Sequence, residues 1–230
     1  MCGIFGEFGN RLLEKEQFLE LNKLSAKRGP DMEGYWSNNQ YSQMGFNRLS
    51  IIDLSSKGNQ PMVTANERWI MVMNGEVYNF HEIRKKLGLK VSDFRSESDA
   101  DVVLTAFNNW GISETLEILN GIFAIALLDT HSENLHLIRD FAGVKPLYYG
   151  IKRNVLIFSS QYDQIFLHPH FNHSKEPNSE SLYDYTQFGY VPAPNAFFID
   201  TWQVEPGEIV SLDLSLKISK KKYYEFSVSD

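Results

Sequence analysis

Cysteine, long apolar runs and positive charge are all scarce in this sequence of 230 residues. A single cysteine, Cys2, excludes an internal disulfide framework and every Cys-x-x-Cys metal or redox motif. The longest uninterrupted apolar run, residues 122–128, is far shorter than the ~20 residues that a membrane-spanning helix needs. A formal charge of -7 and a pI of about 5.4 argue against nucleic acid or an anionic membrane as a partner, because phosphate recognition depends on a positive surface.

The rest of the composition is that of a globular protein. Apolar residues make up 43% of the chain and aromatic residues 13%, which is too much packing material for a disordered segment. The first residues lack the basic start and the apolar stretch of a secretory signal, and no internal repeat or Gly/Ser linker divides the chain. We therefore expect one layered domain over residues 1–230, located in the cytoplasm, with small molecules or proteins as partners.

Apolar patterning predicts strands in the middle of the chain. An apolar run over residues 69–74, bounded by turn signals, predicts a strand that is buried on both faces and brings Asn74-Gly75 to its end. Residues 122–128 and 135–138 flank a short polar stretch, which is typical of a hairpin. Strands and helices do not alternate regularly, so an α+β layered fold is favoured over a parallel doubly wound sheet.

Two segments have helical periodicity. Residues 14–27 carry apolar side chains at three-residue spacing, and residues 101–110 carry them around polar positions. The second segment follows Ser96-Glu97-Ser98-Asp99, where either serine has an acid three residues later and favours a capping box. This places Asp99 near the start of a helix.

Cys2 is the first candidate for chemistry. Removal of Met1 would leave a thiol and a free α-amine on the same residue, which makes a nucleophile and a base of suitable pKa. The alternative is that Cys2 packs as a small apolar side chain in the first strand.

Eight short motifs follow one another along the chain and resemble the glutaminase domain of the class II glutamine amidotransferases, the asparagine synthetase branch in particular. They are Cys2-Gly3-Ile4-Phe5-Gly6, Arg28-Gly29-Pro30-Asp31, Asn47-Arg48-Leu49-Ser50-Ile51-Ile52-Asp53, Gln60-Pro61-Met62, Asn74-Gly75-Glu76-Val77-Tyr78-Asn79, Ser98-Asp99, the segment from Arg139 to Tyr149, and Pro206-Gly207.

The resemblance implies a fold and a reaction. The fold is a four-layer αββα N-terminal-nucleophile hydrolase sandwich with antiparallel sheets. The reaction is hydrolysis of glutamine to glutamate and ammonia through a γ-glutamyl thioester on Cys2. No cofactor is expected in this domain. ATP and magnesium are expected only for a synthetase domain, whose Ser-Gly-Gly-x-Asp-Ser phosphate loop does not occur in the 230 residues. The expected partners are glutamine, a synthetase domain that is C-terminal or separate, and a second copy of the chain in a homodimer.

The resemblance also assigns roles at the two charged ends of glutamine. Arg48, at the end of a predicted strand, resembles the clamp for the α-carboxylate, and Asp99 resembles the partner of the α-ammonium. Backbone groups of Ile51 and Ile52 complete the cradle, and Glu76 supports the α-amino end. The alternatives are that Arg48 and Asp99 are surface charges or an ion pair, and that Glu76 is an acid at a helix N-terminus.

Asn74 and Gly75 resemble the oxyanion hole. An amide side chain and a backbone N–H can hold the negative charge of a tetrahedral intermediate, and glycine permits close approach. The alternative is an Asn-Gly turn in a hairpin.

The histidines are not expected to carry chemistry. His168 and His170, with His173 three residues later, superficially offer three metal ligands, but no carboxylate or cysteine pattern completes a site, so we expect exposed loop histidines.

The sequence departs from the family pattern at Phe46, Asp101 and Gln161, none of which is expected to touch the site.

Two other functions remain open from the sequence. The chain would be an amidohydrolase for another amide if the site did not require a free α-amino acid. It would be a catalytically weak glutamine-sensing or scaffold module if Cys2 were unreactive. Retention of Cys2 argues against the second.

Overall fold

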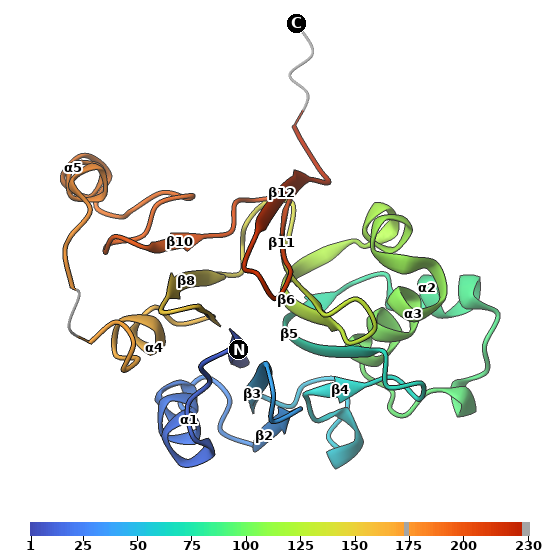
Figure 1. Cartoon of the computed structure of the whole chain (residues 1–230). Helices are drawn as coiled ribbons and strands as arrows, with labels where there is room; N and C mark the ends of the chain where they lie inside the picture. Colours follow the sequence, from blue (N-terminus) through green and yellow to red (C-terminus); the bar gives the residue numbers. More distant parts are fainter. Residues whose placement is uncertain (173–174, 227–230) are drawn as a thin grey trace, which may run out of the picture.

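The computed structural model describes residues 1–172 and 175–226, which form two six-stranded sheets packed face to face (Figure 1). Sheet A has the order β10-β8-β9-β1-β3-β2, sheet B has the order β12-β11-β7-β6-β5-β4, and neighbouring strands are paired antiparallel. The strands of sheet A are β1 (Gly3–Gly9), β2 (Met32–Ser37), β3 (Ser42–Arg48), β8 (Tyr148–Lys152), β9 (Val155–Ser159) and β10 (Thr201–Gln203). Those of sheet B are β4 (Met62–Val63), β5 (Trp69–Val77), β6 (Gly121–Asp129), β7 (Asn134–Arg139), β11 (Glu208–Leu212) and β12 (Ile218–Lys222).

The alternation of side chains along the strands separates three apolar clusters. In β1, Ile4 and Phe8 point into the space between the sheets, whereas Phe5 points outward. In β5, Ile70 and Val72 point into the same space, and Trp69, Met71 and Met73 face the helices. Both faces of each central strand are therefore buried, as we expected for residues 69–74.

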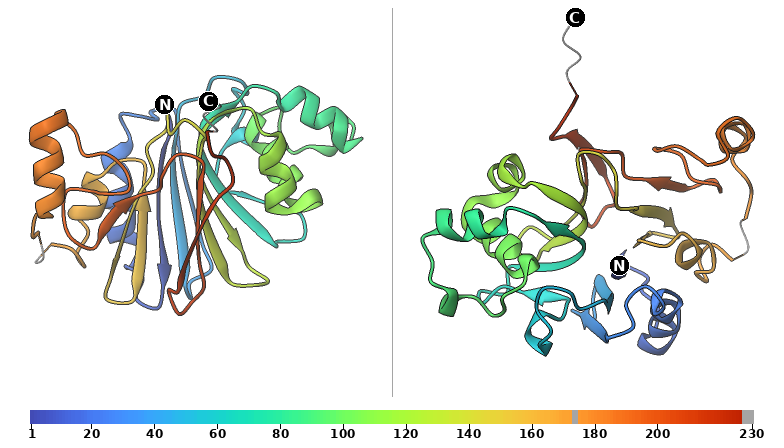
Figure 2. Two further views of the ribbon diagram at one scale, coloured as in Figure 1. Left: turned by 90° about the horizontal axis from the view of Figure 1, so that it is seen from above. Right: turned by 180° about the vertical axis from the view of Figure 1, so that it is seen from behind.

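Helices cover the two outer faces (Figure 2). The helical segments are α1 (Lys15–Asn22), η1 (Lys23–Ser25), η2 (Ser56–Gly58), α2 (Phe80–Leu87), η3 (Val91–Asp93), α3 (Asp99–Ile118), α4 (Asp163–Phe166) and α5 (Ser179–Phe188). Phe107 of α3 and Ile83 of α2 pack against sheet B, while Phe18 of α1 and Ile165 of α4 pack against sheet A. The layers are thus helix, sheet, sheet, helix, which confirms the expected αββα sandwich.

The predicted elements are present with altered bounds. The 122–128 and 135–138 hairpin is β6–β7. The first helix ends earlier than expected, because η1 tightens its last turn. The helical segment predicted over residues 101–110 ends as expected at a break in α3, where Gly111 has a non-helical backbone with φ 79°, and α3 resumes beyond it to Ile118. The prediction that Asn74-Gly75 stands at a strand end is wrong, because β5 stays paired with β6 as far as Val77 opposite Gly121.

The start of α3 is capped, although not by a complete capping box. The side chain of Ser98 accepts a hydrogen bond from the backbone N–H of Asp101. The carboxylate of Asp101 accepts from the N–H of Ser96 at 2.7 Å instead of returning to Ser98. Asp99 is the first residue of the helix, as predicted.

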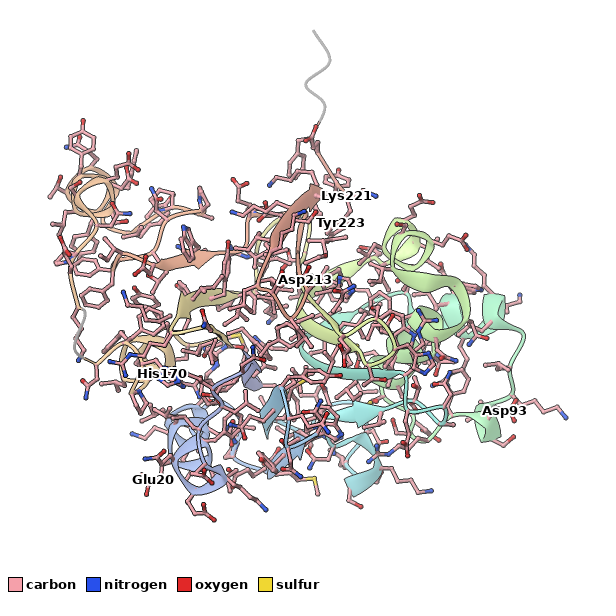
Figure 3. All side chains as sticks on the ribbon, in the orientation of Figure 1. Glu20, Asp93, His170, Asp213, Lys221 and Tyr223 are labelled. Carbon is pink, nitrogen blue, oxygen red and sulfur yellow. The ribbon has the colours of Figure 1, made fainter. Side chains whose placement is uncertain are left out.

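The prediction of exposed histidines is wrong for His168. Its imidazole is fully buried, and Nε2 lies 2.5 Å from Oε1 of Glu7, a buried residue of β1. The chain after α4 turns back against the outer face of sheet A, which brings this histidine to a carboxylate distant in sequence. His170 is half-buried near α4 (Figure 3), and His173 lies outside the described residues.

Within residues 1–172 and 175–226, no group of three His, Cys, Asp or Glu side chains is arranged to hold a metal ion. No helix in those ranges is long and apolar enough to cross a membrane.

Candidate active site

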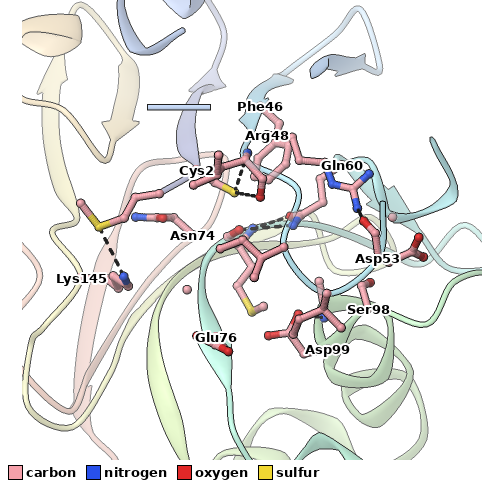
Figure 4. A pocket seen from close by; sticks show the side chains of 18 residues that line it. Cys2, Phe46, Arg48, Asp53, Gln60, Asn74, Glu76, Ser98, Asp99 and Lys145 are labelled. Atoms are coloured by element: carbon pink, nitrogen blue, oxygen red, sulfur yellow. Dashed lines mark hydrogen bonds between the residues drawn. The ribbon is translucent and has the colours of Figure 1, made fainter. Parts of the chain in front are cut away.

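One cavity of about 120 Å³ brings the predicted site residues together (Figure 4). It opens where Cys2 precedes β1, β3 ends, β5 passes and α3 begins. Its lining comprises Met1, Cys2, Phe46, Arg48, Leu49, Ile51, Ile52, Asp53, Gly58, Gln60, Met73, Asn74, Gly75, Glu76, Ser98, Asp99, Ala100 and Lys145. Every site residue that the sequence predicted is in this set.

Cys2 is held from two sides. Arg28 Nε donates to the backbone carbonyl of Cys2 at 3.2 Å. The backbone N–H of Leu49 donates to Sγ at 3.4 Å, and the thiol faces the Leu49 carbonyl at 3.7 Å. The thiol is half-buried and packs beside the inter-sheet core, as the packing alternative expected. Cys2 nevertheless also lines the cavity.

Burial raises the pKa of the Cys2 thiol, against smaller lowering effects of the Leu49 N–H, the chain's terminal ammonium and Arg48. The thiol is therefore protonated near neutral pH and needs a base to become a nucleophile. Met1 is present in the structure and lines the cavity, so the nitrogen of Cys2 is an amide here. The base of the predicted mechanism appears only when Met1 is removed.

Asn74 supplies an unsatisfied donor at the same cavity. Its side chain is buried, and Nδ2 has no hydrogen-bond partner among the described residues. A buried donor without a partner costs ~1–3 kcal/mol, so this group can accept a partner that the described residues do not supply. Asn74 has the same parity in β5 as Ile70 and Val72, which places its side chain on the inter-sheet side near Cys2. A negatively charged oxygen between Cys2 and Asn74 would satisfy this donor.

The close approach of β6 to β5 leaves no room for a side chain at Gly75. A Cβ at this position would lie 2.2 Å from the Ile122 carbonyl oxygen and 2.5 Å from Cα of Phe123 in β6. The Asn-Gly turn alternative is excluded, because both residues are inside β5.

Arg48 ends β3 and is wrapped by the loop that follows. Nη1 donates to the Ser55 carbonyl at 2.6 Å, and Nη2 donates to the Asp53 carbonyl. A Cβ on Gly58 would meet Nη2 at 2.4 Å, so glycine makes room for the guanidinium. The group is buried, and no salt bridge joins it to a carboxylate within the described part of the chain. A fixed, charged guanidinium at a cavity wall can bind a carboxylate.

Asp99 faces the cavity from the opposite side to Arg48 (Figure 4). Oδ2 accepts from the Val77 N–H at 2.8 Å, and Oδ1 accepts from the Ala100 N–H at 2.9 Å, so the carboxylate is fixed by β5 and α3. Burial raises the pKa of Asp99, and the backbone N–H groups partly offset this effect. An ammonium group beside it would stabilise the ionised form.

The structure decides against the alternatives for these charges. Arg48 and Asp99 are buried at the cavity rather than exposed, and they form no ion pair with each other among the described residues. Glu76 is an exposed residue of β5 at the rim of the cavity, not an acid in a helix N-terminus.

Ile51 and Ile52 line the cavity with 68% and 40% of their surface exposed. Ile51 is therefore mostly exposed, whereas more than half of the surface of Ile52 is covered.

The sequence prediction missed several lining residues. Phe46 lies in the wall, so the expectation that no departure from the family pattern touches the site is wrong for this residue. The alternation of side chains along β3 could have identified Phe46, because it lies on the same face as Met44 and two residues before Arg48. Asp101 and Gln161 are not among the lining residues.

Lys145, Asp53 and Gln60 also line the cavity. Lys145 is on the turn between β7 and β8, and its Nζ lies 3.4 Å from Sδ of Met1. Asp53 Oδ2 accepts from the Glu97 N–H at 3.1 Å and so ties the loop after β3 to the loop before α3.

The geometry agrees with what comparison to known families shows. A family model described as a glutamine amidotransferase domain matches residues 1–224. The chain belongs to this family. Its relatives include asparagine synthetase [glutamine-hydrolyzing] 1 of Bacillus subtilis, 31% identical over 98% of this chain and 35% of the relative. A putative asparagine synthetase [glutamine-hydrolyzing] 2 of Methanocaldococcus jannaschii is 32% identical over 97% of this chain and 46% of the relative.

Solved structures confirm the fold. The glutamine phosphoribosylpyrophosphate amidotransferase of B. subtilis superposes with a TM-score of 0.66 over 97% of this chain and 49% of its own, at 16% identity. An allosteric regulatory enzyme of purine biosynthesis gives a TM-score of 0.68 at the same identity. The glutamine amidotransferase chain described here spans less than half the length of each of these proteins.

Proposed function

We propose that this chain hydrolyses glutamine to glutamate and ammonia through a γ-glutamyl thioester on Cys2. One observation carries the proposal: a cysteine thiol and the unsatisfied Nδ2 donor of Asn74 share one cavity, with Arg48 and Asp99 on opposite walls. A substrate with one neutral amide and two oppositely charged ends matches this set of groups. Family membership supports the same assignment.

The proposed steps use groups of the protein and water. The α-amine of Cys2, free after loss of Met1, takes the thiol proton, and the thiolate attacks the side-chain carbonyl carbon of glutamine. The oxyanion is held by Nδ2 of Asn74 and the N–H of Gly75, and the ammonium returns its proton to the leaving nitrogen as ammonia departs. Water, deprotonated by the same amine, then attacks the thioester, releasing glutamate and restoring the thiol.

At the substrate's charged end, Arg48 binds the α-carboxylate and Asp99 the α-ammonium, with Ile51, Ile52 and Glu76 completing the cradle. Burial raises the pKa of the thiol, which is consistent with a need for the α-amine as its base. We expect no cofactor for this half-reaction.

The acceptor of the ammonia belongs to the same proposal. Relatives that this chain covers only in part are named asparagine synthetases. We propose that ammonia passes to an ATP- and magnesium-dependent synthetase domain, C-terminal or separate, in the cytoplasm. We also propose that the chain forms a homodimer, which light scattering would test.

Ammonia release from glutamine by the purified chain lacking Met1 tests the hydrolysis. We expect turnover with glutamine, far slower turnover with an analogue that lacks the α-amino group, and none in Cys2→Ala. Equal turnover of the analogue would indicate an amidohydrolase for another amide. Glutamine binding without turnover would indicate a sensing module. With ATP, aspartate and ammonium, the chain alone should form no asparagine.

A further inference from the structure

Gln60 lies just before the short strand β4, at the point where the pairing of β4 with β5 ends close to Asn74. Strand β4 pairs Met62 with Met71 and Val63 with Ile70, so the same antiparallel register would place Gln60 opposite Met73. The backbone pairing of β4 with β5 begins only at Met62, after Pro61. The main chain of Gln60 instead lies against β2 of the other sheet, where its carbonyl oxygen would be 1.7 Å from a Cβ on Gly34.

The side chain of Gln60 replaces the missing strand residue. Oε1 accepts from the N–H of Met73 at 2.6 Å, and Nε2 donates to the carbonyl of Met73 at 3.3 Å. A hydrogen-bonded pair in an antiparallel ladder exchanges the same two bonds. Gln60 is 7% exposed, so these bonds are shielded from water. Its backbone thus contacts sheet A while its side chain pairs with sheet B.

The pair is adjacent to the proposed oxyanion donor. Met73 precedes Asn74 directly, and Nδ2 of Asn74 has no partner within the described residues that would fix its direction. The direction of this amide therefore depends on the backbone of β5. On the β6 side this backbone is paired through Met73 with Ile125 and Asn74 with Ala124, and on the other side only the Gln60 carboxamide pairs with Met73.

We infer that Gln60 is a positioning residue of this site: its carboxamide completes β5 at Met73 and so holds Asn74 in place to meet the oxyanion. This inference rests on the proposed function. Gln60 acts through Asn74 and needs no contact with glutamine. A misplacement of about 1 Å can cost a factor of ~100 in rate, so losing both bonds should lower kcat by roughly 10- to 100-fold.

A double-mutant cycle tests the inference. Gln60→Leu keeps the approximate size but removes both bonds, and Gln60→Glu, which keeps the acceptor, is the second variant should the leucine not fold. We expect kcat to fall 10- to 100-fold with KM for glutamine within about threefold. In the Asn74→Ala background, the same change should cost less than about threefold, because residues that act through one another are not additive. Multiplicative losses would overturn the inference.

Asn59→Ala is the matched control. Nδ2 of Asn59 donates to the Glu33 carbonyl of β2 at 3.1 Å. The variant therefore loosens the contact of this loop with sheet A and leaves the Gln60 carboxamide paired with Met73. Its kcat should be unchanged. A loss equal to that of Gln60→Leu would assign the effect to the loop and overturn the inference.

Amide exchange separates this inference from the proposed function. In Gln60→Leu the Met73 N–H should exchange at least 10-fold faster, and the side-chain amide resonances of Asn74 should shift. Unchanged exchange and resonances would overturn the inference whether or not the chain is active. Absence of ammonia release from the wild-type chain lacking Met1 would instead refute the proposed function.

Discussion

Replacing Asn74 by alanine should separate catalysis from stability. Nδ2 of Asn74 makes no hydrogen bond to the described residues in the resting structure, so its removal breaks none there. It relieves a buried donor that costs ~1–3 kcal/mol, which offsets the loss of packing at a cavity wall. We therefore expect the free energy of unfolding to change by less than about 1 kcal/mol.

The effect on the reaction should be large. Loss of one oxyanion donor typically lowers kcat by ~100- to 1,000-fold, equivalent to ~2.7–4 kcal/mol of transition-state stabilisation. KM for glutamine should stay within about threefold, because Arg48 and Asp99 hold the charged ends. Ammonia release in steady state and urea unfolding measure the two quantities on one preparation.

Asn79→Ala is the matched control for this experiment. Nδ2 of Asn79 donates to the Ile118 carbonyl at 2.7 Å, and Oδ1 accepts from the Asn120 N–H at 3.0 Å. This variant should lose ~1–3 kcal/mol of stability with little change in kcat. An Asn74→Ala chain with kcat within threefold of wild type, or one that loses stability as Asn79→Ala does, would refute the oxyanion assignment.

Three further predictions concern charge. Arg48→Lys should raise KM for glutamine by roughly 10- to 100-fold with kcat within a few fold, because an ammonium cannot pair with a carboxylate in two parallel bonds; unchanged KM in steady-state kinetics would remove Arg48 from the site. Because burial raises the pKa of Asp99 and only its ionised form binds an ammonium, KM should rise as the pH falls through that raised pKa, whereas Asp99→Asn should show a high KM without this slope. His136 lies in β7 with its Nδ1 2.8 Å from Oγ of Ser211, and burial lowers its pKa to about 4. Its contribution to stability is therefore present above about pH 6.5 and is lost as the pH falls toward 4. Relative to the His136→Asn variant, the wild-type chain should lose about 1–2 kcal/mol of unfolding free energy between pH 7 and pH 5. An equal pH dependence of stability in the two proteins would contradict a buried, uncharged His136.

Periodicity was sufficient for the layered α+β class and for β5, β6, β7, α1 and the first part of α3, because these segments bury regular apolar stretches. The bounds differed where local contacts decide them. The pairing of Val77 with Gly121 extends β5 beyond its apolar run. Ser98, rather than Ser96, is the N-cap of α3.

The site required more than periodicity. Cys2, Arg48, Asn74 and Asp99 are far apart in sequence, and only the resemblance to a family brought them together before the structure did. His168 carried no local sign of burial, because its partner Glu7 is 161 positions away. Gln60 belonged to a recognised motif, but its role depends on where β4 stops, which no pattern in the sequence indicates.

Mass spectrometry of the N-terminal peptide, with and without a glutamine-like electrophile, is the most direct test of the central claim. We expect one covalent adduct, on Cys2, that forms readily when Met1 has been removed, is suppressed by excess glutamine and is nearly absent when Met1 remains. Iodoacetamide, which needs no oxyanion hole, serves as the control for simple thiol exposure. An adduct on another residue, or equal labelling by the glutamine-like electrophile with Met1 retained, would contradict a nucleophile activated by its own α-amine.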